Sequence, residues 1–203
     1  MLKQSGSLRS LQDRIGSFLS IILISPNQLT ILSLVVAVFG SYFIAIENLP
    51  IGLILFAFAA LFDAADGAVA RARGDVTPFG GFLDGVVDRF VEALFLFSFM
   101  FYSLPIVLGL DPCIWLAGVI FLGTCMPSFI RAYADHKGAI TKEKALALGG
   151  IFERSERLLV LIIGLGAGIF VSMDYFVYAL IVCVVFSSIT IIQRIFTIAR
   201  EQK

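Results

Sequence analysis

Long apolar stretches, separated by short polar connections, run through almost the whole chain. A stretch of about 20 apolar residues is long enough to cross a hydrocarbon core roughly 30 Å thick. Such stretches recur at approximately 27–46, 51–71, 80–104, 114–134, 151–171 and 175–196. The pattern therefore predicts an all-α integral membrane protein with six transmembrane helices.

The first 25 residues follow a different pattern, in which apolar and polar positions alternate at helical spacing. The apolar positions are Leu8, Leu11, Ile15, Phe18, Leu19 and Ile22, and they lie opposite Arg9, Gln12, Asp13 and Ser17. A helix with these two faces is typical of the membrane interface. A signal peptide is the alternative, but no small-residue cleavage site follows. We predict an interfacial amphipathic helix at 1–25 and one six-helix domain at 26–203.

The composition agrees with a membrane protein. The chain has 203 residues, of which 59% are hydrophobic and 15% charged, a balance that soluble domains do not show. Its formal net charge is zero, and no nucleic-acid partner is expected. His136 is the sole histidine, which excludes a metal site built from several histidines. The three cysteines lack metal-ligand spacing.

The charged residues are distributed unevenly between the two ends of the predicted spans. The connections near Glu47, Asp111 and Asp174 each carry one acid and neither lysine nor arginine, so all 15 basic residues fall on the other side. By the positive-inside rule, that side is cytoplasmic. We therefore expect a multi-pass protein of the cell membrane whose termini and second connection face the cytoplasm.

Four aspartates interrupt the second and third apolar stretches. Ionisable groups near membrane depth cost several kcal/mol unless something binds them. Asp63 and Asp66 share one helix face, as do Asp84 and Asp88, and the connection at 72–79 has turn chemistry. Two antiparallel helices could thus aim all four carboxylates at one point. Such hard oxygen ligands suit one or two divalent cations.

Small residues and one arginine accompany these acids. Gly67, Ala70 and Gly80 remove side chains beside the carboxylates, and Arg71 supplies a positive charge suited to a phosphate. Together these features indicate a metal-bound nucleotide diphosphate. Two alternatives are a structural ion-pair network and a small cation transporter, although a bare cation path would not need the cleared space.

The stretch from Asp63 to Asp88 resembles the signature D-x-x-D-G-x-x-A-R-x(8)-G-x-x-x-D-x-x-x-D of the CDP-alcohol phosphotransferases, without a substitution. The segment Ser25-Pro26-Asn27-Gln28-Leu29-Thr30 also looks like the start of the first span in that family. The resemblance implies a homodimeric enzyme, dependent on Mg²⁺ or Mn²⁺ and holding two ions. It would transfer a phosphatidyl-type group from a CDP-linked lipid to an alcohol and release CMP.

The resemblance also implies roles for individual residues. Asp63, Asp66 and Asp84 would be metal ligands, and Asp88 would lie near the second metal and act as the general base. Gly67, Ala70 and Gly80 would border the cytidine, and Arg71 would stabilise the arrangement of aspartates and phosphates.

Four arginines at the predicted cytoplasmic ends of the later spans indicate the acceptor. They are Arg131, Arg154, Arg157 and Arg194. A sugar phosphate brings about two negative charges, which arginines bind well. Snorkelling arginines with an ion pair between Glu153 and Arg157 are the alternative explanation.

These arginine segments look like the acceptor-phosphate site of the branch that uses inositol phosphate. The Arg-Ala-Tyr-Ala-Asp sequence at 131–135 and the long connection at 137–148 depart from that branch, which leaves Arg154 and Arg157 as alternative ligands. Glycerol-3-phosphate is the alternative acceptor. The donor could carry diacylglycerol or an archaeal ether lipid, or be soluble CDP-inositol. A G-x-x-x-G motif at Gly164 and Gly168 predicts a helix contact, within or between chains.

Overall fold

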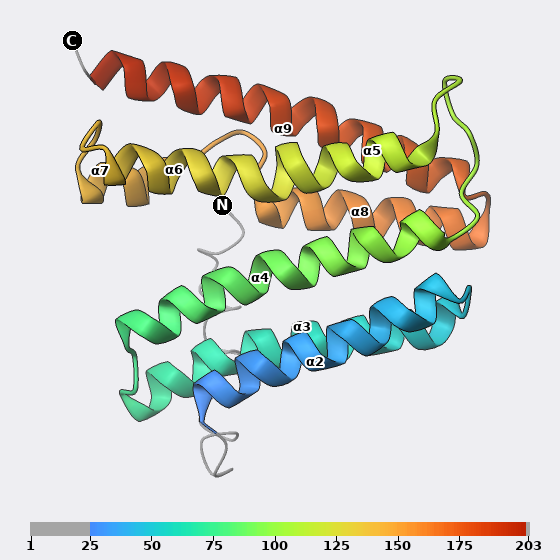
Figure 1. Ribbon diagram of the computed structural model, residues 1–203, viewed down its shortest axis with the longest axis horizontal. Coiled ribbons are helices and arrows are strands. Elements are labelled where there is room, and N and C mark those ends of the chain that lie inside the picture. Colours follow the sequence, from blue (N-terminus) through green and yellow to red (C-terminus); the bar gives the residue numbers. More distant parts are fainter. Residues whose placement is uncertain (1–24, 202–203) are drawn as a thin grey trace. The chain divides into compact units, whose positions relative to one another are not determined.

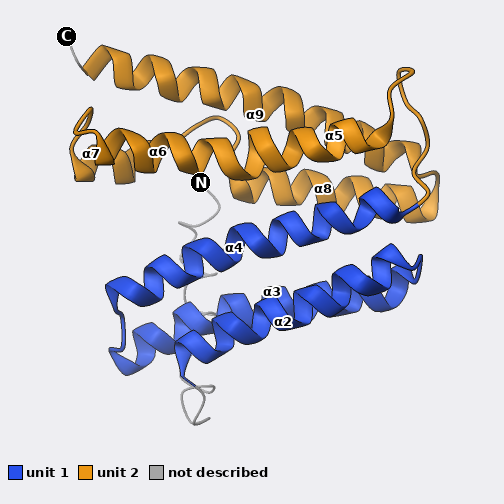
Figure 2. Cartoon of the chain, in the orientation of Figure 1, with its two compact units in different colours: residues 1–102 blue, residues 103–203 orange. Residues whose placement is uncertain are grey.

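The computed structural model describes residues 25–201, so the predicted helix at 1–25 lies outside the described residues apart from its last position. Regular structure in the described part is helical, except for a single bridge between Val107 and Leu110. The all-helical prediction is confirmed there. The chain divides into two compact units, residues 1–102 and residues 103–203 (Figure 2). The single domain at 26–203 stays a prediction.

Between Ser25 and Tyr102, the described part of the first unit, there are three long helices (Figure 1). They are α2 (Pro26–Ala45), α3 (Leu49–Arg73) and α4 (Pro78–Ser98), and α4 continues into the 3₁₀ turn η2 (Phe99–Phe101). Helix α2 packs closely against both α3 and α4, whereas α3 and α4 contact each other much less. The position of α4 relative to α3 is therefore fixed largely through α2.

Local sequence signals explain where these helices begin and end. Helix α2 starts with a capping box, in which the Ser25 side chain accepts from the Gln28 N–H and the Gln28 side chain accepts from the Ser25 N–H. Thr77 caps α4 by accepting from the Gly80 N–H at 3.0 Å. Helix α3 ends at Gly74, whose φ of +71° is left-handed backbone that favours glycine. The chain then reverses within a few residues.

The second unit contains the remaining helices, which differ more in length. They are α5 (Pro112–Gly118), the π-helix η3 (Val119–Cys125), α6 (Met126–His136), α7 (Lys142–Ala147), α8 (Arg154–Phe170) and α9 (Asp174–Glu201). Helices α5, η3 and α6 run on without a break. Helix α9 packs against this run and against α8, so it is the central element of the unit.

Four helices of the described chain are long and apolar enough to cross a membrane. They are Pro26–Ala45, Leu49–Arg73, Pro112–His136 and Asp174–Glu201. This result fits a multi-pass membrane protein. Helix α4 does not meet the same description because it carries Asp84, Asp88, Arg89 and Glu92, and α8 has only 17 residues. Membrane crossing by α4 and α8 stays a prediction.

The two glycines of the G-x-x-x-G motif lie where α8 contacts α9. A Cβ added to Gly164 would come within 2.2 Å of the Ala179 Cβ, and one added to Gly168 would come within 3.1 Å of the Met173 Sδ. The first distance is too short for any side chain, and the second would require a small shift of the Met173 side chain. The motif therefore serves a contact within the chain, where the missing side chains let two helices approach closely.

We expect Gly164→Ala to lower the free energy of unfolding by about 1–3 kcal/mol, the usual range for overpacking. Gly166→Ala is the matched control, because a Cβ there has no neighbour within 4 Å. Alanine also has a higher helix propensity than glycine, so the control should melt at the wild-type temperature or slightly above it. Thermal unfolding in detergent micelles measures both. Equal melting temperatures for the two variants would contradict this close contact.

Candidate active site

Three of the four aspartates of the signature come together in the first unit. Asp63 and Asp66 on α3 and Asp84 on α4 each offer a carboxylate oxygen, and these oxygens lie within 4.8 Å of one another. Asp63 and Asp84 are half-buried, whereas Asp66 is only 4% exposed. Carboxylates this close repel each other unless a cation lies between them, and hard oxygen ligands are what Mg²⁺ and Mn²⁺ prefer. The group therefore fits a divalent cation.

The most buried of these carboxylates has a partner on a third helix. The Thr30 hydroxyl on α2 donates a hydrogen bond to Asp66 Oδ2. Thr30 is itself only 3% exposed. No local pattern predicts this contact, because the two residues are 36 positions apart and a threonine within an apolar helix has many ordinary explanations.

The fourth aspartate, Asp88, lies one helical turn beyond Asp84 on α4. It is not part of the group of three, but its charge lies close enough to Asp66 to act on it. Arg89 Nη1 lies 3.3 Å from Asp88 Oδ2 and donates to the Gly85 carbonyl at 2.8 Å. This neighbouring guanidinium restrains the Asp88 carboxylate on one side.

The predicted nucleotide-contacting residues lie in the same unit as the aspartates. Gly67, Ala70 and Arg71 occupy the last turns of α3, where Arg71 is exposed. A Cβ added to Gly80 would lie 3.1 Å from Thr77 Oγ1 and 3.2 Å from Asn27 Oδ1. Glycine at position 80 thus lets the first turns of α2 and α4 approach each other. The roles of these four residues toward cytidine stay predictions.

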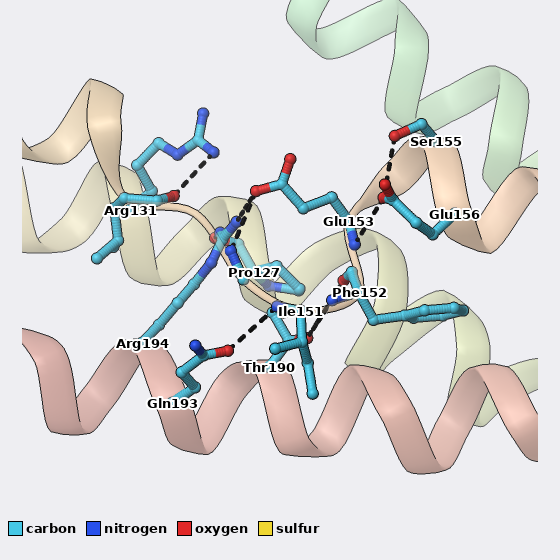
Figure 3. A network of polar contacts seen from close by, with 12 residues as sticks. Pro127, Arg131, Ile151, Phe152, Glu153, Ser155, Glu156, Thr190, Gln193 and Arg194 are labelled. Carbon is cyan, nitrogen blue, oxygen red and sulfur yellow. Dashed lines mark hydrogen bonds and ion pairs between the residues drawn. The ribbon is translucent and has the colours of Figure 1, made fainter. Parts of the chain in front are cut away.

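Arg194 and Arg157 of the second unit are the two buried residues among the predicted acceptor arginines. Figure 3 shows the contacts of Arg194. Its side chain is 4% exposed, and Nη1 donates to the Pro127 carbonyl. Its Nη2 lies 3.8 Å from Glu153 Oε1, which also accepts from the Gly150 N–H at 3.1 Å. Arg194 therefore joins α9 to α6 and to the loop before α8.

The other arginines lie around this contact. Arg131 donates from Nη2 to the Leu148 carbonyl at 3.3 Å, and Arg154 is half-buried at the start of α8. The charges of Arg131 and Arg157 both lie close enough to Arg194 to act on it. The structure thus brings Arg131, Arg157 and Arg194 together into one cationic cluster. Guanidinium groups gathered in this way suit a phosphate group.

The π-helix makes room for one of these arginines. A Cβ added to Gly123 would lie 2.9 Å from the Arg157 Cδ and 3.2 Å from the Ser187 Oγ. Arg157 is 4% exposed, so its side chain passes between the π-helix and α9. Short π segments are frequent at functional sites. Nothing in the hydrophobic pattern of residues 114–134 marks this one.

Side chains of α9 also hold the loop that precedes α8 (Figure 3). Thr190 Oγ1 accepts from the Phe152 N–H at 3.1 Å and Gln193 Oε1 accepts from the Ile151 N–H at 3.1 Å. A capping box between Glu153 and Glu156 then starts α8. These contacts fix the direction in which the first turn of α8 leaves the loop, and with it the positions of Arg154 and Arg157.

Comparison with known proteins identifies the family. Residues 23–190 match the CDP-alcohol phosphatidyltransferase family. The chain belongs to this family. A related sequence, the archaetidylinositol phosphate synthase of Pyrococcus horikoshii, is 37% identical over 185 residues, which cover 91% of this chain and 88% of the relative.

Solved structures share the fold of this CDP-alcohol phosphatidyltransferase. Phosphatidylinositol phosphate synthase of Mycobacterium tuberculosis with CDP-DAG bound has a TM-score of 0.74 at 26% identity, covering 93% of this chain and 94% of that one. The same enzyme in complex with manganese and citrate has a TM-score of 0.72 at 26% identity, covering 93% and 88%. The predicted enzyme family is thus confirmed.

Proposed function

We propose that this chain transfers a phosphatidyl-type or archaetidyl group from a CDP-linked lipid to inositol phosphate, releasing CMP, as a step of phospholipid biosynthesis. The three carboxylates within 4.8 Å of one another, on helices that carry the complete signature, are the observation that carries the proposal. The inositol phosphate acceptor is supported by the relatives, which are named as synthases of inositol phosphate lipids.

Asp63, Asp66 and Asp84 hold the divalent cations in this proposal, with Asp88 beside them. Bound Mg²⁺ or Mn²⁺ would neutralise charge on the pyrophosphate of the donor and on the departing CMP. Support comes from the donor set, which contains only carboxylates, and from the manganese in the related synthase. Gly67, Ala70 and Gly80 border the cytidine, and Arg71 binds donor phosphate.

Asp88 acts as the general base in this proposal. It takes the proton from the acceptor hydroxyl while that oxygen forms a bond to phosphorus and the bond from phosphorus to CMP breaks. A positioned base contributes roughly 10²- to 10⁴-fold to such a step. Its contact with Arg89 supports the role, because a guanidinium at 3.3 Å restrains the position of the carboxylate that would accept the proton.

The acceptor phosphate binds to arginines of the second unit in this proposal. Arg131, Arg154 and Arg157 offer the direct contacts. Arg194 donates a hydrogen bond to the Pro127 carbonyl and forms an ion pair with Glu153, so its main role here is to hold the cluster in place. Guanidinium groups bind a phosphate through paired hydrogen bonds, which glycerol, ethanolamine or serine acceptors would not use.

We further propose six membrane crossings, a cytoplasmic active site with both termini on the same side, and a homodimer in the lipid bilayer of the cell membrane. The uneven distribution of the 15 basic residues supports the orientation. The dimer rests on the resemblance to the family.

The proposal predicts CMP release with only one acceptor. Purified protein is incubated with Mg²⁺, a CDP-linked diacylglycerol or ether lipid, and either labelled inositol phosphate or labelled glycerol-3-phosphate. We expect labelled lipid and CMP with inositol phosphate. Product with glycerol-3-phosphate alone would make the protein a phosphatidylglycerophosphate synthase. Thermal unfolding shows whether the purified protein is folded. If folded protein released no CMP with any alcohol, the enzymatic function would be refuted.

A further inference from the structure

We propose that Thr30 is a positioning residue for the metal site, whose hydroxyl fixes the orientation of the Asp66 carboxylate. This inference rests on the proposed metal-binding role of Asp66. Helix α2 contributes no carboxylate to the group of three, yet it supplies the hydrogen bond to the most buried member.

The bond leaves Asp66 able to bind a cation. A carboxylate has two oxygens with about four lone-pair sites, and the Thr30 hydroxyl uses one of those on Oδ2. The backbone of Gly67 also donates to this carboxylate, and the other lone pairs can serve a cation shared with Asp63 and Asp84. Because the carboxylate can no longer rotate freely, these lone pairs point in a fixed direction.

Thr30 has two acceptors within reach of its hydroxyl, the Asp66 carboxylate and a backbone carbonyl. Its Oγ1 lies 3.1 Å from the Pro26 carbonyl oxygen in the preceding turn of α2. The hydroxyl carries a single hydrogen, and an ionised carboxylate is the stronger acceptor of the two. A helical threonine has only two favoured rotamers at its first side-chain torsion, so fixing its hydroxyl costs little entropy.

The surroundings of this hydroxyl are mostly apolar. Leu29, beside Thr30 on α2, packs with Ala65 and Val69 of α3 in one buried apolar cluster. Thr30 and Asp66 are only 3% and 4% exposed, so their contact is largely shielded from bulk water. Loss of the hydroxyl would thus leave a buried carboxylate oxygen without this donor, next to two other acids.

Loss of a residue that orients a metal ligand typically costs 10- to 100-fold in metal affinity. We therefore expect Thr30→Val, which keeps the shape but lacks the hydroxyl, to bind Mn²⁺ about 10- to 100-fold more weakly. Thr30→Ser keeps a hydroxyl and should bind within about threefold of the wild type, because the same hydrogen bond remains available.

We would measure Mn²⁺ binding to the full chain in detergent, in the absence of the donor and acceptor substrates. The electron paramagnetic resonance signal of free Mn²⁺ reports how much of the ion is bound. Ser33→Ala is the matched control. Ser33 lies one turn further along α2, is fully buried, and donates to the Thr30 carbonyl at 2.7 Å. The Ser33→Ala variant loses a buried hydroxyl from the same helix and should bind Mn²⁺ like the wild type.

Three results would overturn the role of Thr30. They are wild-type affinity in Thr30→Val, equal weakening in Thr30→Val and Ser33→Ala, and no recovery in Thr30→Ser. Thermal unfolding establishes that each variant is folded, and Thr30→Ala replaces Thr30→Val if the latter is not. Absence of Mn²⁺ binding to the wild-type chain would overturn the metal site as well, which separates the two failures.

Discussion

Asp84→Asn should reduce metal-dependent CMP release by about 10³-fold or more. Metal ions stabilise transition-state charge by several kcal/mol, and about 1.4 kcal/mol corresponds to a factor of ten in rate. Asparagine keeps the shape of the side chain but removes the negative charge that would help the other two carboxylates bind a cation. Asp84 is the best of the three positions to test, because it is half-buried and lies on a different helix from Asp63 and Asp66.

The matched control is Asp75→Asn in the connection between α3 and α4. Asp75 is exposed and is not one of the three grouped carboxylates, so its variant loses the same charge a short distance along the chain. CMP release and its dependence on Mg²⁺ concentration should be unchanged in the control. Substantial activity in Asp84→Asn at saturating Mg²⁺ would refute the ligand role of this residue.

Arg194→Ala should act mainly by lowering the free energy of unfolding, and less by weakening the binding of the acceptor. Removing the guanidinium leaves the buried Pro127 carbonyl without this donor, which costs about 1–3 kcal/mol. It also takes from Glu153 a charge partner at 3.8 Å. We therefore expect a clearly lower melting temperature and a matching loss of active enzyme.

Two other arginine variants separate stability from binding. Arg200→Ala removes an exposed arginine from the last turn of the same helix and should melt like the wild type. Arg154→Ala, at a half-buried position, should lower the melting temperature less than Arg194→Ala does but raise the half-saturating concentration of inositol phosphate, with donor binding unchanged. An Arg194→Ala protein of wild-type stability with a raised acceptor requirement would show that Arg194 is a direct ligand after all.

The hydrophobic pattern located the long helices well because burial in lipid demands long apolar runs. The stretch at 27–46 corresponds to α2 at Pro26–Ala45, and that at 175–196 lies within α9 at Asp174–Glu201. Helix α7 and the π-helix were not predicted. A short polar helix has too few apolar positions for a period to be seen, and a π segment inside an apolar run changes no apolar residue.

The predicted site was accessible to sequence reasoning only in part. Asp63, Asp66 and Asp84 stand out because acids are costly in apolar helices, and their spacing indicates a shared face. The contacts of Thr30 with Asp66 and of Arg194 with Pro127 join residues 36 and 67 positions apart. Neither contact has a local signal, since each depends on how two helices pack.

The central place of α2 in its unit also bears on how the protein is made. A chain is synthesised from its N-terminus, so α2 precedes both helices that carry the grouped aspartates. Every contact described for Asp63, Asp66 and Asp84 lies within residues 26–88. The group of three carboxylates can therefore assemble on the nascent chain, from contacts of modest sequence separation, before any residue of the second unit leaves the ribosome.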